Sequence, residues 1–405
     1  MRFRYAVPRQ RQINNKGHHM AFDVEAATAA YIDGLGEEAL AQAAAYTTGN
    51  QWLMLWGLLV SAIITFIIIR TGILAKTADK LSNRGFVVRV FSISAVFLVV
   101  SSLLEMPWSI FSGWWRESQY GRTSQPLMDF LGQGLLALAI SVLLVGIFFV
   151  AIYAFIQKTK KLWWMWGGAF TGLFTAFLMV VGPTYIAPLF NDYQPVPAGE
   201  VRDAVKAMAV EASIPTDRIF MYDGSRQSNN FTANVAGIGG AARIAISDVA
   251  LDEATLDEVK AVTGHEVGHY VLGHVWDGVL LTIIVVMLSF FIADKAFNRV
   301  ARLFGAREDI RDPTTLPVLL FLVSVIGMFT QPVSNTLSRM NETEADHYSY
   351  EMVNLPDGMA SALVKTAEYR NPRPGILEEW LFYTHPSVER RVRAAMEWKA
   401  SHSES

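Results

Sequence analysis

The sequence predicts a mainly α-helical, polytopic membrane protein with about six transmembrane helices and a small β element. Hydrophobic residues make up 52% of its 405 residues and charged residues only 18%, whereas soluble domains carry about a quarter charged residues. The apolar residues are gathered into six blocks with few or no charges. Two polar regions, at about residues 191–274 and 338–405, have a more ordinary composition. This distribution assigns the excess of apolar residues to membrane helices.

Each apolar block is about long enough to cross the hydrocarbon core of a bilayer, which takes about 20 residues of α-helix. The third and fourth blocks contain no charge, and buried helices of soluble proteins rarely run so long without one. Val275 and Trp276 can extend the fifth block past Asp277. Several tryptophans lie near block ends, where interfacial aromatic belts form. The blocks are residues 52–69, 86–104, 130–156, 162–182, 278–293 and 316–333.

The polar regions predict the part of the fold outside the membrane. The first region has the pattern of an amphipathic helix, two short strands and a second helix, for which Asp252 is the expected N-cap. The predicted elements are helix 200–212, strands 219–222 and 242–246, a small-residue turn at 236–241, helix 251–272 and, in the second region, helix 335–352. The expected units are a polar segment 1–50, a four-helix membrane domain 51–190, and a domain 191–405 that two membrane helices interrupt at about 275–294 and 315–335.

Composition also limits the chemistry. The chain has no cysteine, which excludes disulfides, thiolate metal sites and cysteine nucleophiles. Any metal ion must therefore be bound by His, Asp or Glu. The formal net charge is −3 at pH 7, and a general nucleic-acid binder would need a strong basic excess. We expect no nucleic-acid partner.

The most informative motif is His-Glu-Val-Gly-His at residues 265–269, inside the predicted helix 251–272. Residues i and i+4 share one face of a helix, so His265 and His269 can bind one metal ion. Glu266 lies one step round the helix and can reach a water on that metal. This is the HExxH arrangement of zinc peptidases with a zincin-like fold. The alternative is a pair of ordinary surface histidines.

A catalytic zinc ion needs a third protein ligand and an open position for water. The predicted helix 335–352 offers acidic side chains for this role. Glu342 and Asp346 share one face of that helix, and Glu344 points away. Glu342 would be the third ligand, and Asp346 would accept a hydrogen bond from a ligand histidine. The alternative is a charged, solvated helix.

The motifs HEVGH at 265–269 and NTLSRMNETEAD at 335–346 resemble those of the CAAX prenyl protease 1 family of integral-membrane zinc peptidases. The chain looks like a bacterial-type member of that family. The resemblance implies a gluzincin metallopeptidase domain with one Zn²⁺ per chain. It assigns the metal to His265, His269 and Glu342, with Asp346 in contact with a ligand.

The resemblance extends to two further elements. The family's HPxxxxR element falls on His385 and Arg391, and it implies that the histidine steadies the oxyanion and that the arginine helps build the site. The family's edge strand, which binds extended substrate, resembles DGS at 223–225 followed by Asn234. Here the spacing is longer than in the family, and an expected histidine is missing. Asn234 is the candidate substrate-binding residue.

These features predict a membrane-embedded zinc metalloendopeptidase that hydrolyses peptide bonds with a zinc-activated water and Glu266 as general base. The resemblance implies a peptide or protein substrate, prenylated in the case of CAAX-type C-terminal processing, and a site beside the lipid bilayer. Quality control of membrane proteins by a related peptidase is an alternative within the same class. The sequence predicts no particular oligomeric state.

A six-helix transporter with a regulatory zinc site is the alternative from a different class. Transport sites usually leave ionisable residues or broken helices at mid-membrane, and the third and fourth blocks have no ionisable residue. The glycines of these blocks are expected to be helix-packing positions instead. They are Gly132, Gly134, Gly146, Gly167, Gly168 and Gly172.

The signals for membrane orientation conflict. The connections 70–89, 158–161 and 295–311 are rich in Lys and Arg. The positive-inside rule places them in the cytoplasm and both peptidase regions on the opposite side. The resemblance implies the reverse: a multi-pass protein, of the inner membrane if bacterial, with a cytoplasmic active site. We follow the resemblance. A basic stretch at 2–16 agrees with it if Met1 is the start, while Met20 is another candidate start and His18 and His19 are linker residues.

Overall fold

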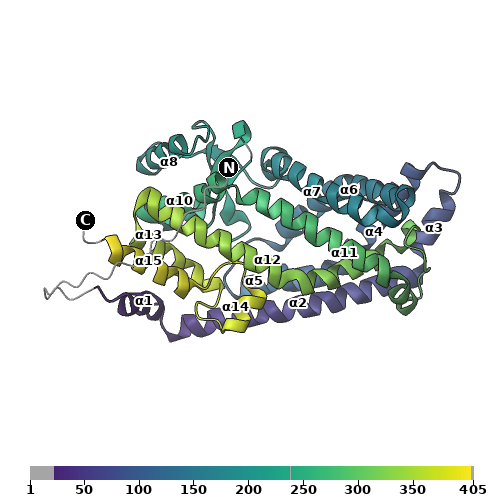
Figure 1. The fold of residues 1–405 in the computed structure, drawn as a ribbon, viewed down its shortest axis with the longest axis horizontal. Coiled ribbons are helices and arrows are strands. Elements are labelled where there is room, and N and C mark those ends of the chain that lie inside the picture. The colour runs from purple at the N-terminus through teal and green to yellow at the C-terminus, as the bar shows by residue number, and fades with distance from the viewer. Residues whose placement is uncertain (1–21, 238, 403–405) are drawn as a thin grey trace.

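The computed structural model describes residues 22–237 and 239–402. In this part of the chain six helices are long and apolar enough to span a membrane, which confirms the predicted number. They run roughly along the long axis of the molecule, with α3 (Ile73–Lys80) at one end and α10 (Leu256–Leu272) at the other (Figure 1). The six are α2 (Glu37–Thr71), α4 (Phe86–Ser109), α6 (Leu127–Lys158), α7 (Trp163–Val181), α11 (His274–Phe304) and α12 (Leu316–Val353).

The remaining elements are shorter, and most of them belong to the end of the molecule that carries α10. A π-helical turn, η1 (Ile110–Trp115), joins α4 to α5 (Arg116–Gln119), so the second span runs on from Phe86 to Gln119. The other helices are α1 (Val24–Asp33), α8 (Glu200–Glu211), α9 (Asp248–Glu253), α13 (Pro356–Thr366), α14 (Ile376–Phe382) and α15 (Val388–His402).

The outer face of the first span is apolar, as a lipid-facing surface requires. On α2, large apolar side chains recur every three or four residues and are 44–58% exposed; they are Trp52, Leu55, Trp56, Leu59, Ile63 and Phe66. Such a stripe is one face of a helix. Contiguous apolar surface of this kind is unfavourable in water but matches the acyl chains of a bilayer.

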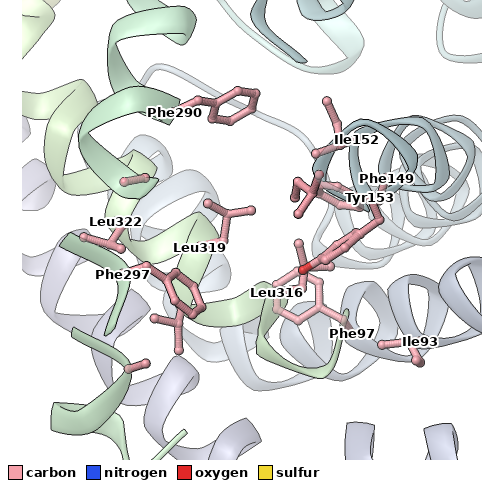
Figure 2. Packing of buried hydrophobic residues seen from close by; sticks show 14 of the residues in the cluster. Ile93, Phe97, Phe149, Ile152, Tyr153, Phe290, Phe297, Leu316, Leu319 and Leu322 are labelled. Carbon is pink, nitrogen blue, oxygen red and sulfur yellow. The ribbon is translucent and has the colours of Figure 1, made fainter. Parts of the chain in front are cut away.

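The spans pack around a buried aromatic and aliphatic core. Side chains from α4, α6, α11 and α12 converge in it (Figure 2). Tyr153 and Leu316 are fully buried at its centre, and Trp163 at its edge donates a hydrogen bond from Nε1 to Asp294 Oδ1 at 2.9 Å. The labelled members are Ile93, Phe97, Phe149, Ile152, Tyr153, Phe290, Phe297, Leu316, Leu319 and Leu322.

Glycines let α7 and α11 approach each other closely. A Cβ added to Gly168 would lie 3.0 Å from the backbone of Met287, and one added to Gly172 would overlap Ile283. Gly167 and Gly146 likewise face Phe290 and Phe91. The packing prediction is wrong for Gly132 and Gly134, because nothing among the described residues lies within 4 Å of their Cβ positions.

A four-stranded mixed sheet lies beside α10. Its strands are β1 (Tyr193–Pro195), β2 (Ile219–Tyr222), β3 (Ala233–Ala236) and β4 (Arg243–Ser247), in the order β1-β2-β4-β3. β2 and β4 run parallel, while β1 and β3 pair antiparallel at the two edges. Every residue of β4 is buried, so β4 anchors the sheet and leaves β3 as an edge strand. Strands 219–222 and 242–246 were both predicted, the second within one residue.

The structure corrects two predicted helices. The helix predicted at 251–272 is divided, because Ala254 is extended and Thr255 begins α10 with its own capping box with Glu258. Thr255 is therefore the N-cap of α10, and the prediction of Asp252 is wrong. The helix predicted at 335–352 is the continuation of the sixth span, because α12 runs unbroken from Leu316 to Val353.

The N-terminal predictions are only partly covered. Residues 22–50, predicted as a polar segment, form α1 and the first turns of α2. Residue Ile32 of α1 is fully buried against α13 and α15. The basic stretch 2–16, His18, His19 and Met20 lie outside the described residues.

Replacing Gly168 with Leu is expected to destabilise the protein by about 1–3 kcal/mol, the usual cost of overpacking a tight contact. The backbone of Met287 cannot yield as a flexible side chain can. Thermal unfolding in detergent measures the effect. Gly132→Leu is the matched control, since this exposed glycine has open space around it. Equal melting temperatures of the two variants would contradict this account of the α7–α11 contact.

Candidate metal centre

The side chains predicted to bind the metal come from two helices that lie in close contact, α10 and α12. Two glycines of α10 make this contact possible. A Cβ on Gly268 would lie 3.2 Å from the backbone of Ala345, and one on Gly264 would lie 2.8 Å from Ser349 Oγ. Ser349 also donates a hydrogen bond to the carbonyl oxygen of Ala261 at 2.7 Å. The helices are therefore joined along the faces that carry the predicted ligands.

Three predicted ligands meet at one point. His265 Nε2 lies 3.1 Å from His269 Nε2 and 3.3 Å from Glu342 Oε2. His269 Nε2 lies 3.3 Å from Glu342 Oε1. A tetrahedral zinc ion with bonds of about 2.0–2.1 Å separates its ligand atoms by roughly 3.3–3.4 Å. The spacing of the three side chains therefore fits one zinc ion.

One of the oxygen atoms that face the predicted metal position lacks a hydrogen-bond partner in the part of the chain that the structure describes. Glu342 Oε2 is buried and has no hydrogen-bond donor among the described residues. A buried carboxylate oxygen without a partner is costly. Two imidazole nitrogens and a carboxylate form a normal ligand set for catalytic zinc, which keeps a fourth position open. The residues present fit the metal that the sequence predicts.

Asp346 and Arg391 support the first ligand. Asp346 Oδ1 lies 2.9 Å from His265 Nδ1, so it can accept the N–H that the metal-facing nitrogen lacks. Arg391 donates two hydrogen bonds to Asp346, from Nε at 2.8 Å and from Nη2 at 2.6 Å, and its Nη1 lies 3.6 Å from Glu342. All four side chains are buried. This arrangement brings together the predicted residues of α10, α12 and α15.

In the metal-free chain, protonation of His265 competes with metal binding. Burial lowers the pKa of His265, but the nearby carboxylates of Asp346 and Glu342 outweigh burial and raise the pKa to about 9. The metal must therefore displace a proton from this histidine near neutral pH.

His274, which the sequence analysis missed, supports the second ligand. Its Nδ1 lies 2.8 Å from His269 Nδ1, and its Nε2 lies 3.2 Å from Glu344 Oε2. Glu344 does point away from the metal ligands, as predicted, but it holds His274. The chain bends at Gly273, which ends α10 in the left-handed region with a φ of 75°, and His274 directly after the bend lies against His269. The signal in the sequence was Gly-His directly after the motif helix.

Glu266 and His385 flank the ligands. Burial raises the pKa of Glu266 above its ordinary value, which suits a carboxylate that must accept a proton near neutral pH. His385 Nε2 lies 3.3 Å from Glu342 Oε1, and its Nδ1 lies 2.8 Å from Thr384 Oγ1. Burial is the largest cause that lowers the pKa of His385, to about 3, so its ring is neutral.

The predicted substrate strand is found in part. Asn234 lies on the edge strand β3, opposite Ala245 of β4. The DGS segment at 223–225 does not lie on that strand. Asp223 follows the inner strand β2 and accepts hydrogen bonds from Asn191 and Asp192, while Ser225 bonds to Asp248. Of the residues that the resemblance assigned to the edge strand, only Asn234 lies on it.

Two cavities adjoin the ligands. The first, of about 480 Å³, is lined by His269 and Glu342, by Val235, Ala236 and Gly237 at the end of β3, and by apolar side chains of α11 together with apolar and polar side chains of α12. The second, of about 440 Å³, includes His385 and residues of α2. The two cavities share no lining residue. The metal centre therefore lies between an apolar space and a more polar one.

Comparison with known protein families identifies the class of protein to which this chain belongs. Residues 195–399, which contain all three ligands, match peptidase family M48. The chain belongs to peptidase family M48. Residues 22–192 match the family described as CAAX prenyl protease N-terminal, five membrane helices. The protein is thus an integral, multi-pass membrane metallopeptidase, and its family implies a metal, typically zinc, and a peptide or protein substrate.

Individual relatives cover most of this M48 peptidase. The uncharacterized metalloprotease YhfN of Bacillus subtilis is 28% identical over 88% of this chain and 85% of its own length. The CAAX prenyl protease 1 homolog of Arabidopsis thaliana is 27% identical over 76% of this chain and 73% of its own. The crystal structure of S. mikatae Ste24p superposes with a TM-score of 0.74 over 92% of this chain and 94% of its own, at 18% identity. That likeness establishes the fold.

Replacing His274 with Gln is expected to weaken zinc binding about 10- to 100-fold, because His269 loses the partner that orients it. Competition with a chelator measures the affinity, and a thermal scan checks folding. His347→Gln is the matched control, since His347 forms an exposed pair with Glu351 on the same helix, 3.4 Å apart. Unchanged zinc affinity in folded His274→Gln would show that this contact does not support the ligand.

Proposed function

We propose that this peptidase is a zinc metalloendopeptidase that cleaves proteins near their C-terminus, as in CAAX-type processing, with Glu266 as general base. The convergence of His265, His269 and Glu342 on one point, with Glu266 next to the first of them in the motif, carries the proposal. Relatives named CAAX prenyl protease 1 homolog support the C-terminal substrate. The family assignment favours this enzyme over a transporter with a regulatory zinc site.

The chemistry is divided among a few side chains. When bound, zinc acts as a Lewis acid and lowers the pKa of a water in the site. Glu266 takes a proton from that water and passes it to the leaving amine. The neutral ring of His385 donates a hydrogen bond to the carbonyl oxygen of the scissile peptide as negative charge develops there. Asp346 and Arg391 hold the first ligand in place throughout.

The edge strand gives the substrate its position. An extended peptide can pair with the free side of β3, which adds main-chain hydrogen bonds whatever its side chains are. Asn234 on this strand would hold the peptide backbone beside the metal centre. Pairing of this kind suits an endopeptidase, because it fixes the scissile bond without requiring one particular residue.

Glu266→Gln is expected to fold and bind zinc but to lose hydrolysis of a peptide substrate by about 10²-fold or more, because the amide cannot accept the proton. The measurements are zinc content and turnover of a quenched fluorescent peptide, with and without a prenylated cysteine. Retained activity in Glu266→Gln would exclude this mechanism. Zinc binding by the wild type without turnover of any peptide would favour a non-catalytic protein.

We further propose that the catalytic end faces the cytoplasm. The three basic connections predicted to be cytoplasmic lie with α3 at the opposite end of the bundle from α10 (Figure 1). The basic residues Arg2, Arg4, Arg9, Arg11 and Lys16, however, precede α1, which packs against α13 and α15 at the catalytic end. The family placement of the active site therefore agrees with the charge of this N-terminal stretch if Met1 is the start.

A reporter fused after Ser405 tests the orientation. It should be active in the cytoplasm and inactive on the opposite side, because α15 at the catalytic end leads into the C-terminus. A second reporter inserted in the connection between α11 and α12 is the control and should give the opposite result. The reverse pattern would show that the positive-inside rule holds for this protein.

A further inference from the structure

The second cavity contains a cation without a counter-ion. Arg370 lines this cavity of about 440 Å³ together with Tyr369, Thr384 and His385, and with Asn50 and Gln51 of α2. Among the described residues no carboxylate lies within 4 Å of Arg370; it contacts Tyr369, whose ring centre lies 5.3 Å from the guanidinium carbon. Burial disfavours the charged form and lowers the pKa of Arg370, although an arginine stays protonated in proteins.

Three arginines close to Arg370 in the sequence differ from it in this respect. Arg373 is paired with Asp33 and Glu389, Arg390 with Glu379, and Arg391 with Asp346. A partly buried cation is normally paired, because removing it from water is costly. The side chains around Arg370 are amides, hydroxyls and aromatic rings. An anion from outside the chain would complete this site.

The charges of the metal centre do not supply the missing counter-ion. Asp346 is neutralised by Arg391. With zinc held by His265, His269 and Glu342, the negative charges of Glu342 and Glu266 would together offset the charge of the divalent ion. Arg370 feels the charge of Glu342 but makes no contact with it. With the metal bound, Arg370 is left as a net positive charge next to His385.

The direction of β3 indicates which part of a substrate reaches Arg370. Antiparallel pairing is the slightly more stable mode, and it places the N-terminal part of a peptide beside Ala236 and Gly237. Those residues line the first, apolar cavity. The C-terminal part of the peptide then runs toward the start of β3.

The start of β3 is connected to the second cavity. Asn229, just before this strand, donates a backbone hydrogen bond to the carbonyl oxygen of Arg122 at 2.9 Å. The guanidinium of Arg122 lies 5.9 Å from the ring centre of Tyr369, which lines the cavity beside Arg370. A peptide paired in this way would have its leaving fragment on the side of β3 from which these contacts lead to the wall of the second cavity, and the part before the scissile bond on the side of the apolar cavity.

We propose that Arg370 binds the free α-carboxylate at the C-terminus of the substrate, on the leaving side of the scissile bond. This inference rests on the proposed peptidase function and adds to it a residue, Arg370, that would recognise the chain end of the substrate. An arginine binds a carboxylate through two parallel hydrogen bonds, which gives geometric selectivity as well as charge. An acidic side chain has the same chemistry, and the experiment separates the two sources.

Two fluorogenic peptides that differ only in ending as a free acid or as a carboxamide test the proposal on the zinc-loaded, full-length protein. The wild type should cleave the acid with a kcat/KM roughly 10- to 100-fold higher, as expected for one charge-assisted hydrogen bond. A third peptide, a carboxamide with Glu as its last residue, should be cleaved as slowly as the plain amide. Equal rates on acid and amide, or recovery of the rate by the added Glu, would overturn the assignment of an α-carboxylate.

Arg370→Gln should cleave the acid as slowly as the amide, and Arg370→Lys should keep part of the preference. Arg373→Gln, at a nearby ion-paired arginine outside both cavities, should keep all of it. Discrimination that survives in Arg370→Gln would overturn the role of Arg370, and if that variant does not fold, Arg370→Lys decides the point. If the wild type cleaves neither peptide, the peptidase function itself has failed. Protection against thermal unfolding by the two uncleaved peptides then tests the carboxylate site separately.

Discussion

The catalytic centre depends on the close contact between α10 and α12. Two helices can lie this near only where no side chain separates them. Gly264, just before the motif, and Gly268, within it, allow this approach because they have no side chain. Any side chain at Gly268 would push Ala345 away and with it Glu342, one turn earlier on α12. The second glycine of this contact thus matters for the metal although it binds nothing.

A layer of charges surrounds this contact. Arg391 reaches from α15 to Asp346 and toward Glu342, so one buried guanidinium ties α15 to α12 beside the ligands. Buried charges are tolerated when each is paired and hydrogen-bonded. Asp346 and Arg391 neutralise each other, and we assign them to the construction of the site. Arg370 has no carboxylate partner among the described residues, and we assign it to substrate binding.

The parts of the fold that follow from local pattern could be predicted. Blocks of uncharged residues gave the six spans, and i,i+4 spacing placed His265 and His269 on one face. Residues joined by tertiary contacts could not be found in this way. His274 and Glu344 are separated by a complete membrane hairpin, and Arg370 is exceptional only because no carboxylate among the described side chains lies within 4 Å of it. Asp252 failed as an N-cap because Thr255 with Glu258 offers the backbone a better one. Glu342, Arg391 and His385 were reached through family resemblance, since their own spacing does not show that they meet.

The helices that carry the ligands are not separate from the membrane spans. α11 begins at His274, directly after the residue that ends α10, and α12 passes without interruption from the bilayer to Glu342. No flexible linker isolates the metal from the lipid. A bilayer thicker or thinner than the apolar length of these helices makes them tilt. That tilt would move Glu342 relative to His265 and His269. The thickness of the membrane would therefore affect the geometry of the metal ligands.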